Sequence, residues 1–125
     1  EKMGEGRILV RFLDIKDFHI HVIFGTNKVL AENPKAASAF LEGWFESIRF
    51  MRANKAATVK IAAEVTEKDE EITSKVYDEL MPMFSDDGRF DAKALALLSR
   101  SLLELDILKT EPDMSKLYTE AFLPK

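Results

Sequence analysis

The stretch NPKAASAFLEGWFESIRFMR, residues 33–52, decides the fold of this chain because it predicts a long helix with one apolar face. Asn33 offers a side-chain acceptor at the cap, and Pro34 follows where a missing amide costs nothing. Apolar residues then recur every three or four positions, as they do on a helix face that packs against a core. That face comprises Ala37, Phe40, Leu41, Trp44, Ile48 and Met51. We therefore expect the core to form here, with Trp44 near its middle.

Three further helices are predicted downstream from their periodicity and caps. They cover residues Lys55 to Glu64, Glu67 to Met81 and Ala92 to Asp106. Thr66 followed by Asp69 resembles a capping box, and Asp91 is a good N-cap for the last helix. The residues 85–88, SDDG, predict a turn between the last two helices.

Two segments upstream have the pattern of strands. The first is Arg7 to Leu13, and the second is Phe18 to Phe24, in which apolar residues alternate with the two histidines. Since side chains alternate across a strand, the second segment has one apolar face. The predicted fold class is therefore mainly α with a short N-terminal β segment.

Composition limits the classes of function. The 125 residues include 18 basic and 22 acidic side chains, net charge −4, and the basic ones form no stripe, so nucleic acid is not an expected partner. The chain has no cysteine, which excludes disulfides and every zinc site that depends on sulfur. No apolar run approaches the roughly 20 residues that span a bilayer.

The two histidines are the first candidates for site chemistry. His19 and His21 are two residues apart, so on a strand they lie on one face, as two metal-binding imidazoles often do. A third ligand is not evident in the sequence, and we favour a strand face turned to solvent or to a cleft. No metal and no other cofactor is predicted.

Motifs for catalysis are also missing from the sequence. The serines lack a nucleophile-elbow motif, and no glycine-rich loop is present that would hold phosphate. Glu70 and Glu71 are adjacent at a predicted helix start, where acidic residues are common. The aromatic residues Trp44, Phe40, Phe45 and Phe50 could form a ligand cage, but core packing explains most of them better. We therefore do not expect an enzyme.

Three stretches, in this order along the chain, resemble segments of bacterial extracytoplasmic solute-binding proteins. They are FGTNKVLAENP at residues 24–34 with the helix after it, MPMFSDDGRFD at residues 81–91, and the closing DMSKLY and FLP at residues 113–118 and 122–124. The relevant branch serves ABC importers for nitrate, alkanesulfonates, taurine and thiamine precursors. Arg7 to Leu9 likewise resembles the strand before the return crossover of that family.

The resemblance implies a two-lobed α/β parent with the type II periplasmic-binding-protein fold, whose lobes close on the ligand about two crossing strands. We expect this chain to be only the C-terminal part. Residues 1–25 would be a strand segment and interlobe crossover, and residues 26–125 the helical C-terminal part of a lobe. The location implied is periplasmic or otherwise extracytoplasmic.

The crossover is the segment that the resemblance brings closest to the cleft. Its predicted ligand-binding residues are Asp17, Phe18, His19 and His21. The implied partners of the parent are a small organic or anionic solute and the ABC permease. The two histidines differ from the small or polar residues expected at this place in the family.

A helical ligand-sensing or dimerisation domain of a regulator is the alternative from a different class. Amphipathic helices suit it equally well. Strands over Arg7 to Leu13 and Phe18 to Phe24 would favour the binding protein, whereas helices there would favour the regulator. An enzyme comes third, through thiamine-precursor synthesis in the same broad family.

The apolar alternation in the second strand-like segment predicts a homodimer. Phe18, Ile20, Val22 and Phe24 form one face, and an unpaired strand edge offers its donors and acceptors to a second copy. A self-complementary contact closes as a two-fold dimer. We expect Val22→Lys to weaken the dimer, because it places a charge on the buried face. Light scattering measures the dimer, and a monomer at high concentration in the chain without the substitution would contradict the prediction.

Overall fold

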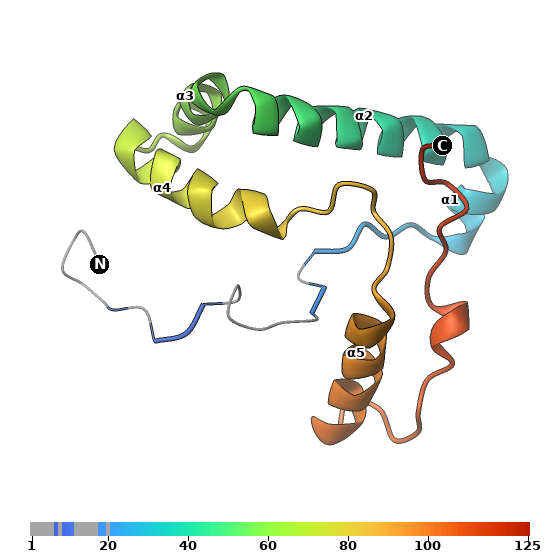
Figure 1. Cartoon of the computed structure of the whole chain (residues 1–125). Coiled ribbons are helices and arrows are strands. Elements are labelled where there is room, and N and C mark those ends of the chain that lie inside the picture. Colours follow the sequence, from blue (N-terminus) through green and yellow to red (C-terminus); the bar gives the residue numbers. More distant parts are fainter. Residues whose placement is uncertain (1–6, 8, 12–17, 20) are drawn as a thin grey trace. The chain divides into compact units, whose positions relative to one another are not determined.

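The computed structural model describes residues 7, 9–11, 18, 19 and 21–125 (Figure 1). The chain divides into two compact units. The first unit contains the described residues up to His19 together with Phe90–Met114, and the second contains His21–Arg89 and Ser115–Lys125. Each unit is described by itself below.

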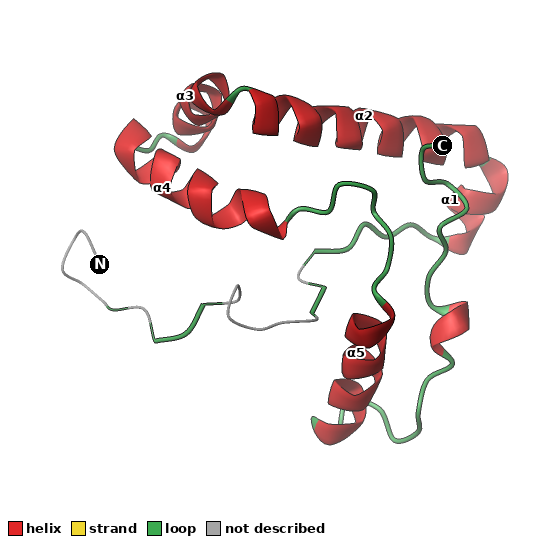
Figure 2. Ribbon diagram, viewed as in Figure 1, coloured by secondary structure: helices red, strands yellow, loops and turns green. Residues whose placement is uncertain are grey.

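Four helices and a short 3₁₀ turn form most of the second unit. They are α1 (Asn27–Glu32), α2 (Pro34–Ala53), α3 (Lys55–Thr66), α4 (Glu70–Leu80) and η2 (Met81–Met83) (Figure 2). The helices predicted from Pro34, Lys55 and Glu67 are confirmed, the third with a later start, and α1 is additional.

The start of α2 differs from the prediction in one detail. Pro34 is at the first helical position as expected, but the side chain of Asn33 makes no capping hydrogen bond. Asn33 also ends α1, and its backbone amide donates to the carbonyl of Val29 at 2.9 Å. Because the chain passes directly from one helix to the next, Asn33 lacks the extended backbone that an N-cap side chain needs.

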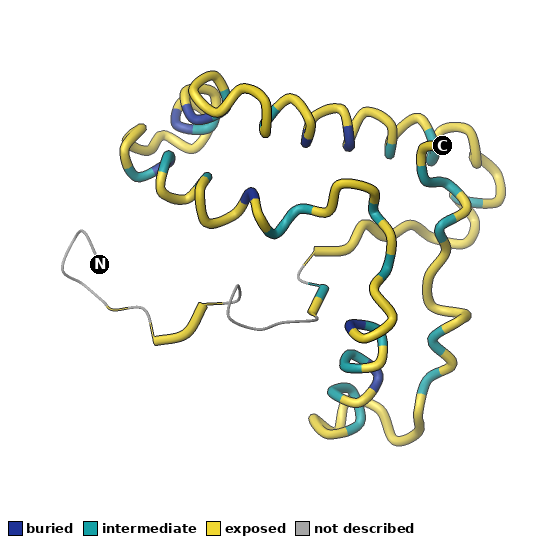
Figure 3. The backbone as a smooth tube through the Cα atoms, in the orientation of Figure 1, coloured by how far each residue is buried: buried dark blue, intermediate teal, exposed yellow. Residues whose placement is uncertain are grey.

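The core of the second unit forms between α2 and the segment that follows α4. Phe45, Ile48 and Met81 are buried together (Figure 3). Partly buried residues pack around them: Leu41, Met51, Tyr77, Phe84 and Leu123. The hydroxyl of Tyr77 also donates to the carbonyl of Met51 at 2.6 Å, which joins α4 to α2.

The buried face of α2 overlaps the predicted one, but Phe45 takes the central place expected for Trp44. Phe45 is 5% exposed, whereas Trp44 is 38% and Phe40 is 57% exposed, so the prediction that Trp44 lies in the middle of the core is wrong. Of the residues first chosen, Ile48 is buried and Leu41 and Met51 pack against the core, so this part of the prediction is confirmed. Since apolar residues cover more than half of this helix, periodicity alone does not select the face that packs.

The join between α3 and α4 explains why α4 begins late. Glu67 ends α3 in the left-handed conformation, with φ 54°. Asp69 then caps α4, its carboxylate accepting the amides of Glu71 and Ile72. Thr66 takes no part in this cap because its hydroxyl donates to the carbonyl of Ala62 inside α3. The predicted capping box is therefore wrong, and Asp69 acts as an ordinary N-cap.

In the first unit, α5 (Ala92–Glu104) begins at the predicted N-cap, Asp91. Ala94 and Ser99 are its buried residues. Leu105 is the C-cap of the helix, Asp106 follows in the left-handed conformation with φ 57°, and the amides of Ile107 and Leu108 return to the carbonyl of Leu102. A short 3₁₀ turn, η3 (Met114–Lys116), lies further along the chain.

Within the predicted N-terminal β segment, none of the described residues forms a strand (Figure 2). These are Arg7, residues 9–11, Phe18, His19 and residues 21–24. The mainly α class is confirmed for the part of the chain that the structure describes, and the β segment is not confirmed.

The turn before α5 depends on Gly88. It has φ +74°, and its amide donates to Oγ of Ser85 at 2.9 Å. A methyl group on Gly88 would lie 2.6 Å from Cζ of Phe45 and 2.8 Å from Cδ2 of Leu123. Both the backbone conformation and the packing therefore require glycine.

Two glycine substitutions test this packing. Gly88→Ala should destabilise the chain by about 2 kcal/mol or more, from left-handed strain and the clash with Phe45. Gly43→Ala is the control, because nothing lies within 4 Å of a methyl group there, and alanine favours a helix by about 0.5–1 kcal/mol. Urea unfolding measures both. Equal effects of the two substitutions would show that the Gly88 contact is unimportant.

Candidate functional site

The predicted ligand-binding residues fall in both units. Phe18 and His19 belong to the first unit and His21 to the second. Asp17 lies outside the described residues. Phe18 and His21 are exposed, and His19 is half-buried.

His19 is held against the start of α5. Its Nε2 accepts the backbone amide of Asp91 at 3.1 Å. Its ring meets the ring of Phe90 edge to face, with centroids 5.2 Å apart and an angle of 77° between the planes. Two contacts thus fix this imidazole to a segment that is distant in sequence, which the sequence alone did not predict.

Asp91 caps α5 through its carboxylate. Oδ1 accepts the amide of Lys93 at 2.8 Å and that of Ala94 at 3.0 Å. The Ala94 amide is the largest cause that lowers the pKa of the Asp91 carboxyl below its ordinary value, and Lys93 adds to this through its amide and its charge. The carboxylate is thus kept ionised and fixes the start of the helix.

His21 belongs to a row of aromatic rings in the second unit, formed by His21, Phe84, Trp44 and Phe40. The imidazole stacks on Phe84, with centroids 6.0 Å apart and planes 4° from parallel. Trp44 lies 6.4 Å from Phe84 on one side and 6.4 Å from Phe40 on the other. The planes of Trp44 and Phe84 are tilted by 51°, so the four rings do not form one flat surface.

The aromatic row corrects the cage first considered for α2. Phe40 and Trp44 do come together, but Phe45 is a core residue. Phe84 was not singled out, although it lies in one of the quoted stretches, MPMFSDDGRFD. Its contact with Trp44 links segments forty residues apart, and no local pattern reveals that link.

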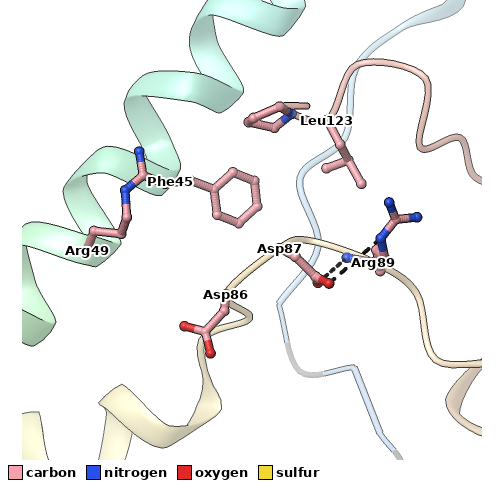
Figure 4. Close-up of a pocket in the computed structure, with 7 residues that line it drawn as sticks. Phe45, Arg49, Asp86, Asp87, Arg89 and Leu123 are labelled. Carbon is pink, nitrogen blue, oxygen red and sulfur yellow. Dashed lines mark hydrogen bonds and ion pairs between the residues drawn. The ribbon is translucent and has the colours of Figure 1, made fainter.

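A small hollow lies beside the core of the second unit (Figure 4). Its volume is about 150 Å³, and it is lined by Phe45, Arg49, Asp86, Asp87, Arg89, Leu123 and Pro124. Asp86 is 3.1 Å from Arg52, while Arg89 reaches both Asp87 at 3.8 Å and Glu120 at 3.2 Å. Small-molecule sites usually enclose about 300–1,000 Å³. The hollow is therefore smaller than a usual small-molecule site, and we assign it to the packing around Gly88.

Neither a metal-binding cluster nor a membrane-spanning helix is found in the part of the chain that the structure describes. No three histidine, cysteine or acidic side chains gather there as a metal site would require. None of the helices found there is long and apolar enough to cross a membrane.

Comparison with known proteins adds no relative. No protein-family model, curated protein or solved structure matched this chain. The functional assignment therefore depends on the residues of the chain itself.

The cap of α5 predicts a dependence of stability on pH. The folded state lowers the pKa of Asp91, so its stabilising effect is present above the ordinary value of 3.8 and is lost as the pH falls through the folded value. Asp91→Asn keeps a capping oxygen that does not titrate. Relative to this variant, the unsubstituted chain should lose stability between about pH 5 and pH 2. Thermal unfolding measures the difference, and parallel pH curves would contradict the prediction.

Proposed function

We propose that this chain is the C-terminal portion of an extracytoplasmic solute-binding protein, which delivers a small organic or anionic solute to an ABC permease and catalyses no reaction. One observation carries the proposal. The three stretches that resemble this family meet at a single point, where Gly88 lies between Phe45 and Leu123.

The close packing there gives a physical reason for the order of these stretches. Phe45 comes from α2, Gly88 from the turn after η2, and Leu123 from the closing segment. Arg89 adds an ion pair with Glu120 at 3.2 Å between the same turn and the same closing segment. These contacts support treating the three stretches as one packed unit.

The proposal also accounts for the exposed apolar residues at the crossover. Val22 is 58% and Phe24 is 92% exposed, although both are large and apolar. In a two-lobed parent these residues would pair with further strands of the same lobe, which this chain does not contain. A two-stranded ribbon alone is only marginally stable in water, which fits the lack of strand at residues 21–24.

The ligand contacts remain those of the crossover. Phe18, His19 and His21 are the described candidates, and His21 continues into the aromatic row. Aromatic surface with a few directed polar groups is the usual composition of a small-molecule site. Charged groups of the solute would find their partners mainly in the other lobe.

The two leading segments do not discriminate between the solute-binding protein and the regulator. Strands over Arg7 to Leu13 and Phe18 to Phe24 would have favoured the first and helices the second, and the described residues of both segments are neither. The proposal therefore depends on the three resembling stretches.

Calorimetry tests this proposal. The 125-residue chain should bind taurine, methanesulfonate or thiamine precursors weakly or not at all, because trapping a solute needs groups from both lobes. A longer product of the same gene, with an N-terminal lobe, should bind one such solute at micromolar concentration. Micromolar binding by the short chain would refute the claim that most of the site lies elsewhere. A gene that encodes no upstream lobe or secretion signal would refute the function.

A further inference from the structure

A second face of α2 carries an apolar stripe that no described residue covers. Phe40 is 57% and Phe50 is 48% exposed, and Gly43 and Ser47 lie exposed between them. The four residues are three, four and three positions apart, so they line up along one side of the helix. A methyl group on Gly43 would meet nothing within 4 Å. Glycine weakens a helix interior, and no contact of the described chain requires it here.

The order of side-chain sizes in this stripe is the same in both directions along α2. It runs large, small, small, large through Phe40, Gly43, Ser47 and Phe50. A second copy of α2 in the antiparallel direction would therefore place Phe40 opposite Phe50, and Gly43 opposite Ser47, on both sides of a two-fold axis. The small residues at the middle would let the two backbones approach, with the rings at either end. Such a self-complementary contact closes after two chains.

The charges beside the stripe follow the same symmetry. Glu42 and Arg49 lie on one flank of it, and the antiparallel arrangement would bring Glu42 level with Arg49 of the second copy. Neither forms an ion pair with a described residue. Although Arg49 lines the hollow, it pairs with neither Asp86 nor Asp87 (Figure 4). Two unpaired charges of opposite sign would thus meet twice across the axis, which is complementarity of charge as well as of shape.

Burial of the stripe leaves no polar group without a partner. The hydroxyl of Ser47 donates to the carbonyl of Gly43 at 2.8 Å within the same helix. Trp44, 38% exposed and 6.4 Å from the Phe40 ring, adds apolar area on the flank away from Glu42. At about 200 Å² for each aromatic side chain, Phe40, Trp44 and Phe50 leave about 300 Å² exposed on each copy. A standard interface buries about 800 Å² on each partner, so the association is expected to be weak.

We propose that α2 pairs with α2 of a second copy of this chain in a two-fold antiparallel dimer, through the stripe Phe40, Gly43, Ser47 and Phe50. This interface does not rest on the proposed function, and it is separate from the strand edge at residues 18–24. Glu46 lies near the axis on the same flank as Glu46 of the second copy. This like-charged pair opposes the association and keeps it weak.

Sedimentation of the 125-residue chain between about 10 µM and about 1 mM measures the association. We expect a reversible equilibrium between monomer and dimer. Trp44 is the single tryptophan of the chain, and its emission should shift to shorter wavelength as the dimer forms. A chain that stays monomeric over this range, or a dimer that leaves the emission of Trp44 unchanged, would overturn the proposal.

Gly43→Gln separates the interface from the fold. The new side chain has free space within the chain, and glutamine favours a helix over glycine, so the monomer should resist more urea than the unsubstituted chain. In the dimer it meets Ser47 of the second copy, so association should fall about tenfold or more. Val22→Lys is the matched control and should leave association unchanged, in contrast to the strand-edge prediction. Loss of the dimer in Val22→Lys together with its retention in Gly43→Gln would overturn the proposal and assign the dimer to the strand edge.

Charge reversal tests the antiparallel direction. Glu42→Arg places like charges opposite each other at Arg49 and should weaken the dimer roughly three- to tenfold, and Arg49→Glu should do the same. The double variant should restore the affinity of the unsubstituted chain, because it exchanges the two members of each pair. Glu46→Gln should strengthen the dimer, since it removes the like-charged pair near the axis. A double variant that associates no better than the single ones, or a Glu46→Gln variant no better than the unsubstituted chain, would overturn the proposed arrangement.

Discussion

The contact between the ring of Phe45 and the backbone at Gly88 is the constraint on which the second unit depends. It brings the turn after η2 within van der Waals distance of α2, and Leu123 closes the same contact from the C-terminal segment. No side chain fits at Gly88, and its left-handed backbone also favours glycine. Arg52 ties the turn to α2 a second time, through the Phe84 carbonyl at 2.7 Å and Asp86 at 3.1 Å. The exposed ion pair with Asp86 adds little stability beside the buried ring.

The position of this turn decides what the surface around it can do. Phe84 lies just before the turn, where its ring reaches both His21 and Trp44. The aromatic row therefore exists only because the core contact places Phe84 opposite α2.

In the first unit, too, a contact between residues distant in sequence fixes the local structure. Asp91 caps α5 with its carboxylate, and His19 accepts the Asp91 amide, so two side chains complete the helix start. One belongs to the helix and the other to the segment proposed to contact the solute. A hydrogen bond of this kind contributes about 1 kcal/mol. That is enough to restrain the His19 ring against the start of α5.

The sequence by itself determined where α2, α3 and α5 begin, because caps, prolines and periodicity act over a few residues. Pro34, Asp91 and the turn ending at Gly88 were all predicted correctly. Only the tertiary structure decided which aromatic residue of α2 enters the core and that His19 accepts the Asp91 amide. Phe45, and not Trp44, enters the core because Gly88 and Leu123 approach that side of the helix. Such contacts join segments tens of residues apart, and local patterns carry no information about them.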